Sequence, residues 1–268
     1  MSARFTLIAS LAAVAFGAPF AAQAQYTIKL GGAYIDPHAT SEPLRGGVAV
    51  PAPLGGNLVL NGGVAFQVQP QGTAIFAIER ALTDHWSVEF VLGNPPKHDV
   101  KLKVDNPQID ASNVTPGSTP YSAAQAQGAA INGLRTKLAA QNGQVVSTVR
   151  QWAPTVFFNY KFFDASSSVR PYVGVGINVT RFKARTTAAG DTLYADGARP
   201  EISLSDSIGP AVQVGVSYKL DQHWSLNASV ATARVDNKLT IVTQSGLRQE
   251  SSFRFNPTAY TATLGYSF

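Results

Sequence analysis

Two features that exported and membrane proteins often rely on are scarce in this chain of 268 residues, namely cysteine and long apolar runs. No cysteine is present, so no disulfide can stabilise the fold, and the chain must bury a core large enough to be stable without one. Beyond the N-terminal region, no stretch reaches the roughly 18 uninterrupted apolar residues of a transmembrane helix. If the protein lies in a membrane, it must therefore be a closed β-barrel, which also satisfies every backbone group in lipid.

Motifs for nucleic-acid recognition are missing as well, and the net charge of +5 is mild. We therefore expect contact with anionic lipid head groups rather than with nucleic acid. His38 and His98 stand near Asp36 and Asp99, but these pairs are too short and too separate for a metal-ligand pattern. We interpret the histidines as solvated loop residues and expect neither a metal nor another cofactor.

The first 24 residues have the pattern of a secretory signal. One early cation, Arg4, precedes an apolar run, and Ala22-Gln23-Ala24 forms a small-x-small cleavage site. A membrane anchor is the less favoured alternative, because the apolar run is short and Gly17 interrupts it. The pattern predicts a signal peptide at 1–24 and one barrel domain at 25–268.

Apolar and polar residues alternate in eight later segments, as in β-strands with one apolar face. These segments are 26–35, 72–82, 85–93, 151–163, 169–180, 207–220, 223–233 and 260–268. A half-buried sandwich would also alternate, but the connections discriminate between the two folds. Short links alternate strictly with long ones, which span roughly 36–72, 94–147, 183–204 and 236–250. This layout predicts an all-β fold, an eight-stranded antiparallel transmembrane β-barrel with short periplasmic turns and long extracellular loops.

Aromatic residues support this interpretation, because they share both the apolar parity and the short-turn end of their strands. They are Tyr26, Trp86, Phe162, Tyr218, Trp224, Tyr266 and Phe268. Aromatics gathered at one level around a barrel form a girdle at the membrane interface. Ordinary strand-end core aromatics, the alternative, would not need to share both properties.

Several stretches resemble the OmpW family of eight-stranded outer-membrane proteins, to which the AlkL-type hydrocarbon importers also belong. They are "HWSVEFVLGNPPKHDV", "APTVFFNYKFFDASSSVRPYVGVGINVTRF", "DSIGPAVQVGVSYKLDQHWSLNASV" and the terminal "LGYSF". The resemblance implies a porin-like protein in the outer membrane of a Gram-negative bacterium that takes up small hydrophobic molecules through a lateral opening. The expected partners are outer-membrane lipids including lipopolysaccharide, small hydrophobic ligands, and the barrel-assembly machinery through the strand ending at Phe268.

Charged residues on the inward parity predict a plug in the lumen. They are Lys29, Glu79, Glu89, Lys161, Arg170 and Lys219. Eight strands leave an interior that side chains can fill, and unpaired buried charges are costly, so these residues should pair. The favoured interpretation is that they are structural ion pairs of the barrel core, which need no ligand, and either way a straight-through pore is disfavoured.

Toward the outer end the inward parity becomes apolar, which predicts a ligand-binding cup formed by Ile35, Ile75, Val91, Phe157 and Phe182. Ordinary packing of the barrel interior is the alternative. A ligand that meets the plug must leave sideways, and proline interrupts strand pairing because it lacks the N–H donor. Pro95, Pro96 and Pro154 flank the longest loop and predict this lateral exit, although proline can also simply end a strand.

A repeated motif and a possible helix are the remaining features of the sequence, and a rival function stays open. His-Trp-Ser occurs twice, at 85–87 and 223–225, and Glu89 shares the face of the first copy. Because this face points into the lumen near the periplasm, we expect no catalytic residue and no enzyme. Residues 121–142 form either a short helix in the second long loop, with Ile131, Leu134 and Leu138 at helical spacing, or a disordered loop, and the pattern leaves both open. The rival to a transporter is a structural or surface-interaction barrel, whose long loops bind a partner.

Overall fold

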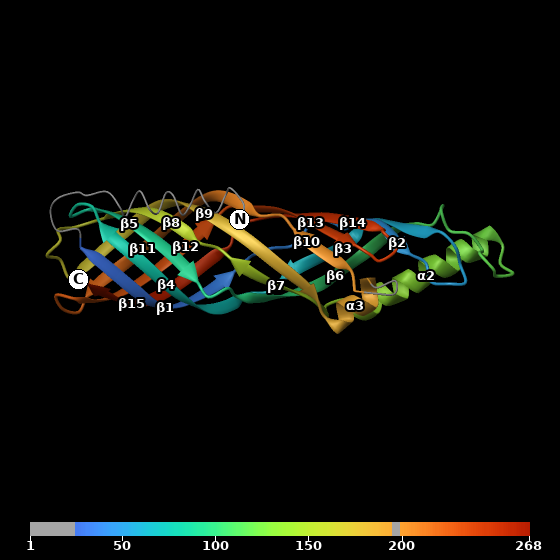
Figure 1. Ribbon diagram of the computed structural model, residues 1–268, viewed down its shortest axis with the longest axis horizontal. Coiled ribbons are helices and arrows are strands. Elements are labelled where there is room, and N and C mark those ends of the chain that lie inside the picture. The colour runs from blue at the N-terminus through green and yellow to red at the C-terminus, as the bar shows by residue number, and fades with distance from the viewer. Residues whose placement is uncertain (1–24, 195–198) are drawn as a thin grey trace.

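Eight antiparallel strands close into a barrel in the computed structural model, which describes residues 25–194 and 199–268 (Figure 1). They are β1 (Tyr26–Asp36), β4 (Gln71–Ala81), β5 (Trp86–Gly93), β8 (Thr155–Lys161), β9 (Val169–Thr186), β11 (Ser207–Lys219), β12 (Trp224–Ala233) and β15 (Thr258–Ser267). Each strand pairs with the next in this order, and β15 closes the ring by pairing with β1. The predicted fold is confirmed; the predicted signal segment at 1–24 lies outside the described residues.

Side chains in this barrel are apolar outside and polar inside, as the alternation predicted. Val175 on β9 is 62% exposed on the outer surface, whereas Asn159 on β8 is 1% exposed inside. At the turn end, outward aromatics contact one another, as in the Trp224–Tyr266 pair with ring centroids 4.9 Å apart. An outward apolar belt edged by aromatics is the surface that a lipid bilayer requires.

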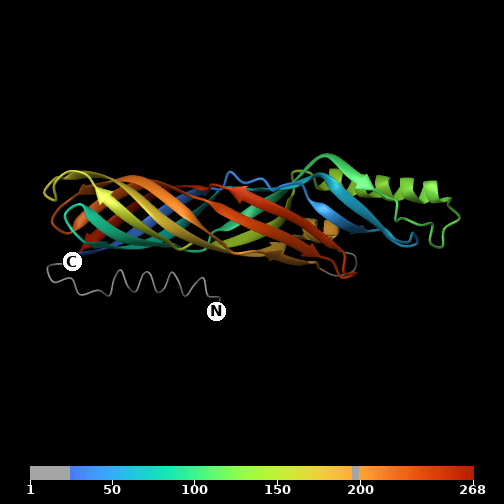
Figure 2. The same ribbon diagram turned by 90° about the horizontal axis from the view of Figure 1, so that it is seen from above.

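Seven further strands lie in or directly after the four segments that the sequence predicted as long loops, and they extend the barrel beyond its outer end. They are β2 (Arg45–Ala49), β3 (Asn57–Val68), β6 (Lys97–Asp110), β7 (Val145–Trp152), β10 (Glu201–Leu204), β13 (Val235–Val242) and β14 (Arg248–Phe255). With the outer half of β9 they form a curved sheet in the order β10-β13-β14-β2-β3-β6-β7-β9, here called the extension. Figures 1 and 2 show the barrel and the extension end to end in one elongated molecule.

The extension reverses the polarity of the barrel. Its interior is a hydrophobic core in which Leu58, Leu102 and Ile241 are 2%, 1% and 1% exposed. The reversal occurs along β9 itself, where the outward positions change from Val175 and Ile177 to Arg181, Lys183 and Arg185. A surface that turns from apolar to cationic along one strand marks the level where lipid tails give way to head groups and water.

Two helices pack against the extension, α2 (Ala123–Gln141) toward its far end and α3 (Ala188–Tyr194) beside β7 (Figure 1). Of the two alternatives for 121–142, the helix is thus confirmed as α2. Ser122 caps it, accepting a hydrogen bond from the Gln125 N–H while the Gln125 side chain accepts one from the Ser122 N–H. The buried side chains of α2 join the core of the extension, so the helix covers the end opposite the C-terminus (Figure 1). None of the helices in the described residues has the length and apolarity that a membrane crossing requires.

Candidate functional site

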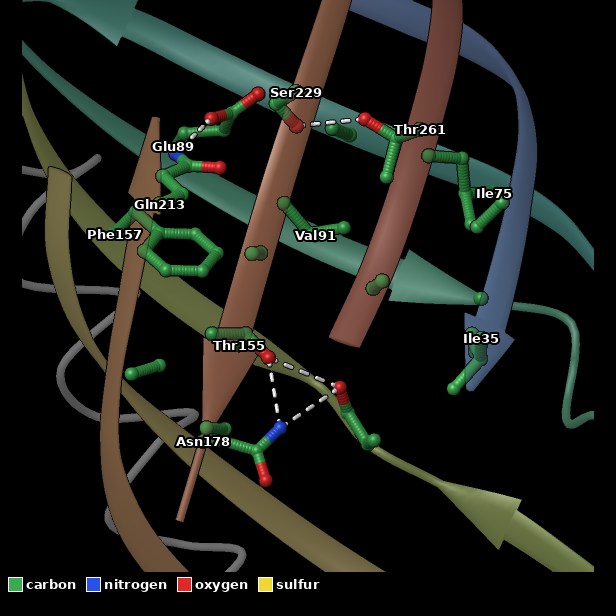
Figure 3. Close-up of a pocket in the computed structure, with 18 of the residues that line it drawn as sticks. Ile35, Ile75, Glu89, Val91, Thr155, Phe157, Asn178, Gln213, Ser229 and Thr261 are labelled. Atoms are coloured by element: carbon green, nitrogen blue, oxygen red, sulfur yellow. Dashed lines mark hydrogen bonds between the residues drawn. The ribbon is translucent and has the colours of Figure 1, made fainter. Parts of the chain in front are cut away.

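A cavity of about 140 Å³, here called the barrel cavity, lies inside the outer half of the barrel. Ile35, Ile75, Val91 and Phe157, four of the five residues predicted to form the cup, line it (Figure 3). Polar side chains in the wall form hydrogen bonds with one another, so their polar groups are not free to bind a ligand in the cavity. The Asn178 amide donates to Thr155 Oγ1 at 2.8 Å, for example, and the hydroxyls of Ser229 and Thr261 lie 2.7 Å apart. The free surface is therefore largely apolar and suits an uncharged ligand.

Phe182, the fifth predicted cup residue, lines a different cavity of about 50 Å³ inside the extension, here called the extension cavity. The reason is that β9 continues past the barrel instead of ending at its rim, which carries Phe182 beyond the level of Phe157. Gln151 lines both cavities, so the extension cavity lies on the outer side of the barrel cavity.

The floor of the barrel cavity is a buried ion network. Lys29 Nζ lies 2.7 Å from Glu79 Oε2 and 2.7 Å from Glu89 Oε1. Lys161 Nζ lies 2.5 Å from Glu79 Oε1, so both carboxylates are neutralised within the lumen. Lys29 also lines a third cavity, of about 120 Å³, on the turn side. The network is therefore a thin partition across the barrel.

Two amides complete this partition, and the sequence reasoning did not single them out. Asn159 and Gln213 each donate to Glu89 Oε2, at 3.0 and 2.9 Å, and Gln213 also donates to Asn159 Oδ1 at 2.8 Å. Gly174 lies between them in the strand register, and a Cβ there would stand 2.0 Å from Asn159 Oδ1. The signal that could have found the pair is this inward row of Asn, Gly and Gln on three adjacent strands.

Arg170 and Lys219 were expected to pair with carboxylates in the plug, but they bond backbone carbonyls at the turns. Arg170 donates to the carbonyls of Asp84 at 2.5 Å and Phe163 at 3.0 Å, and Lys219 donates to that of Ala165. Both side chains lie where the turns present carbonyls without strand partners, which explains the difference. They fasten the turns to one another below the ion network.

The prolines predicted to form a lateral exit lie at a break in the wall, with Pro95 and Pro154 inside it and Pro96 at its edge. Pairing between β5 and β8 ends at Val91 and Thr155. Pairing resumes between β6 and β7, where the Gln151 N–H donates to the Pro96 carbonyl at 3.2 Å. No register pair joins 92–95 to 152–154, and we call this unpaired stretch of the described wall the seam.

Each side of the seam remains bonded to its other neighbour. The Asn94 N–H donates to the Ala74 carbonyl on β4 at 2.8 Å, and the Pro154 carbonyl accepts from Val179 on β9 at 3.1 Å. The edges are thus held in place without being joined to each other. Gly93 and Ala153 belong to both the seam and the lining of the barrel cavity, so the cavity reaches the wall at this break.

Neither His-Trp-Ser copy forms a base–nucleophile pair. His85 Nδ1 lies 2.9 Å from the Lys161 carbonyl, and His223 Nδ1 lies 3.0 Å from the Ser267 carbonyl. Both rings stack on neighbouring tyrosines at the turn end. This geometry fastens the turn-side ends of the strands and does not prepare a serine for attack.

The two outer histidines differ from each other. His38 is exposed, as predicted, with Nδ1 3.5 Å from Asp36 Oδ1. The prediction of a solvated side chain is wrong for His98, which is 1% exposed inside the extension, because the supposed loop is strand β6. Among the described residues, no group of three or more potential metal ligands comes together.

Comparisons with known proteins agree with the fold. The model of the OmpW family matches residues 128–268. Outer membrane protein W of Salmonella typhi is 35% identical over 127 residues, which cover 46% of this chain and 56% of that protein. The chain thus spans about half the length of the curated relatives it matches.

Two solved structures share the architecture. The crystal structure of OprG from Pseudomonas aeruginosa superposes with a TM-score of 0.65 at 20% identity, covering 91% of this chain and 96% of that one. The solid-state NMR structure of AlkL in lipid bilayers superposes with a TM-score of 0.52 at 19% identity, covering 94% of each chain. At these identities the similarity establishes the fold.

Proposed function

The chain belongs to the OmpW family of outer-membrane proteins, and we propose that it is a passive channel that delivers small hydrophobic molecules from outside the cell into the outer membrane. One observation carries the proposal. The apolar barrel cavity is closed on the turn side by the ion network, whereas the strands of its wall are unpaired at the seam. An apolar solute held by Ile75 and Phe157 has no favourable way through the ion network around Lys29. The seam beside Gly93 and Ala153 offers a way out toward lipid instead.

Energetics favour this route for apolar solutes alone. Passing the floor would require a solute to separate Lys29 from Glu79 and Glu89, which leaves buried charges unpaired. Moving through the seam breaks no register pair, because none joins its two edges. A hydrophobic solute also gains by leaving water for the lipid that surrounds the barrel, at about 25 cal/mol per Å² of apolar surface.

The test is uptake of radiolabelled toluene into proteoliposomes containing the full-length mature protein. The variant Pro95→Ala/Pro96→Ala/Pro154→Ala restores three backbone donors at the seam and should slow uptake. Pro210→Ala is the matched control, because Pro210 lies exposed on β11, within the pairing with β9. Heat-modifiability on gels verifies that each barrel is folded.

The outcomes distinguish a transporter from a structural barrel. Uptake above that of empty liposomes, reduced in the triple variant and retained in Pro210→Ala, supports lateral delivery. Uptake no faster than that of empty liposomes for the wild type contradicts transport and favours the rival function, a structural barrel whose extension binds a partner.

Lipopolysaccharide is the partner proposed for the outer surface just above the apolar belt. Lys97, Arg150 and Lys183 stand directly opposite one another on β6, β7 and β9. Like charges in one cross-strand row destabilise a sheet unless an anion lies over them. Lys183 Nζ also lies 5.5 Å from the ring centroid of Trp152, a residue type that marks the membrane interface. Phosphates of lipopolysaccharide suit this row, which we call the basic row.

Strand β15 is the element proposed to engage the barrel-assembly machinery. Its outward face is apolar, with aromatic rings at Tyr260 and Tyr266, and Phe268 beyond its end is 67% exposed. The Phe268 N–H donates to the Tyr26 carbonyl on β1 at 2.9 Å, so in the folded protein this end is held against the first strand.

A further inference from the structure

The extension cavity has an apolar wall interrupted by two polar side chains with unsatisfied atoms. Phe182 on β9 and Phe253 on β14 contribute to the wall, and His98 on β6 and Asn237 on β13 are the polar residues. His98 is 1% exposed and Asn237 is 6% exposed. Nε2 of His98 and Oδ1 of Asn237 are buried without a hydrogen-bond partner among the described residues.

Such atoms are rare in folded proteins, because each has lost its hydration without regaining a hydrogen bond. Ser147 in the same cavity follows the usual rule, since its hydroxyl donates to the Arg185 carbonyl at 2.9 Å. Two unsatisfied atoms in one apolar cavity therefore point to a ligand that satisfies them.

The chemistry of the two atoms defines what the ligand must supply. His98 Nδ1 lies 2.9 Å from the Gln69 carbonyl, which can only accept, so Nδ1 carries the proton. In the neutral ring Nε2 is then an acceptor, and Asn237 Oδ1 is an acceptor as well. Burial lowers the pKa of His98, which keeps the ring neutral, and no other residue lining the cavity titrates.

We propose that the extension cavity binds small apolar molecules that carry a hydrogen-bond donor, of which a short aliphatic alcohol is the simplest. The hydroxyl donates to His98 Nε2 or to Asn237 Oδ1, and the carbon chain lies against Phe182 and Phe253. A cavity of about 50 Å³ accommodates a hydroxyl with a short chain. Gln151 lines both cavities, which makes this a first binding site outside the barrel cavity. That place on a route rests on the proposed function, whereas the binding itself does not.

The test compares two isomers, 1-butanol and diethyl ether, on the purified full-length mature protein in detergent micelles. They contain the same atoms, but only 1-butanol donates a hydrogen bond. Ring ¹⁵N resonances of His98 follow binding at Nε2 during each titration. We expect 1-butanol to shift the Nε2 resonance and to bind on the order of tenfold more tightly than the ether, since it alone satisfies a buried acceptor.

Variants separate the acceptors from the cavity around them. Asn237→Leu keeps the approximate shape of the side chain but removes Oδ1. His98→Phe removes Nε2, and in that variant the side-chain amide resonances of Asn237 follow binding. Each should reduce the preference for the alcohol, whereas Ser147→Ala should keep it because that hydroxyl is already engaged. Equal binding of both isomers, His98 Nε2 and Asn237 amide resonances that neither isomer shifts, or a preference that survives both acceptor variants would overturn the proposal.

Toluene, which has no donor, keeps this inference apart from the proposed function. Toluene uptake without any alcohol preference would sink the binding site and leave transport intact. A clear alcohol preference at His98 without toluene uptake would support the site and count against transport.

Discussion

Glu79 and Glu89 stand directly opposite each other on β4 and β5, and the ammonium of Lys29 lies 2.7 Å from an oxygen of each. Like charges in opposed positions on neighbouring strands repel, and these two are almost fully buried. The barrel can hold both carboxylates because one cation from β1 bridges them, and Lys161 adds a second contact to Glu79 at 2.5 Å. The floor of the barrel cavity is thus also a structural element.

We predict that Lys29→Met destabilises the barrel by about 3–5 kcal/mol, because it leaves buried carboxylates facing each other without their bridging cation. Reversible guanidinium unfolding in micelles, followed by tryptophan fluorescence, measures the free energy of unfolding.

Lys219→Met is the matched control, since Lys219 is exposed and its ammonium donates to a backbone carbonyl, that of Ala165, and not to a carboxylate of the ion network. Its cost should stay near the 0–1 kcal/mol typical of exposed charges. Restoring neutrality with Lys29→Met/Glu89→Gln, which leaves Glu79 paired with Lys161, should recover most of the lost stability. If the single and double variants unfold alike, an unpaired Glu89 carboxylate is not what destabilises the barrel.

A second prediction concerns the seam, and the absence of native cysteine makes it simple to test. Leu92 and Pro154 would be the next register pair beyond Val91 and Thr155. Joining Leu92→Cys to Pro154→Cys with a short bifunctional thiol reagent should slow toluene uptake at least tenfold, because it closes the proposed exit. Uptake into proteoliposomes before and after cross-linking gives the measurement.

Phe90→Cys/Val156→Cys is the control, because these residues already pair on the same two strands. Cross-linking them should leave uptake unchanged. Equal inhibition by both cross-links would mean that the reagent acts on the barrel generally, and uptake that persists through a closed seam would contradict lateral exit.

The eight barrel strands could be predicted because their inward and outward environments differ at every step. Val173, Val175 and Ile177 face lipid while Gly174 and Gly176 face the lumen, and this contrast is written directly into the sequence. The same parity led to four of the residues that line the barrel cavity, although their role in ligand binding stays a prediction. Long-range partners could not be predicted at this level. Asn159 lies diagonally opposite Glu89 on the neighbouring strand β8, but Gln213 reaches Glu89 from β11 only because the sheet curves around the lumen.

The extension was missed although its pattern was present. In β6, Val100 and Leu102 alternate with Lys101 and Lys103, but with the apolar side chains inside. A search for lipid-facing strands interprets such charged segments as loops, since the rule for outward residues reverses once a strand leaves the membrane. That same assumption placed His98 in solvent, whereas its strand carries it into the core.

The depressed pKa of His98 gives a third prediction, on stability against pH. Burial lowers the pKa of the folded-state ring below its usual value near 6.5, so the unfolded chain binds the proton more readily. Stability is therefore complete above about pH 6.5 and should fall as pH decreases, by up to about 1.4 kcal/mol per unit. Of the nearby charges, Asp99 opposes the shift from the outer face of the same strand.

Unfolding of the wild type and of His98→Phe between pH 7.5 and 5.0 tests this dependence. As pH falls, the unfolding free energy of the wild type should decrease more than that of His98→Phe. His38→Phe is the matched control, because the ring of His38 is exposed and lies outside the extension cavity. A pH dependence that is the same in the wild type and in His98→Phe would mean that His98 titrates normally.

The last prediction concerns the basic row of Lys97, Arg150 and Lys183. Replacing all three with Gln should weaken retention of lipopolysaccharide by about 1 kcal/mol per cation removed, and less at high salt, because the attraction to phosphate is electrostatic. Native mass spectrometry of protein released from lipopolysaccharide-containing nanodiscs counts the molecules retained. Arg135→Gln/Lys137→Gln is the control, since both residues lie on α2 at the far end of the extension. Equal retention by the row variant and the control would remove the row as a phosphate site. The sheet should then gain stability from the substitutions, because three opposed cations would have been repelling one another without a ligand.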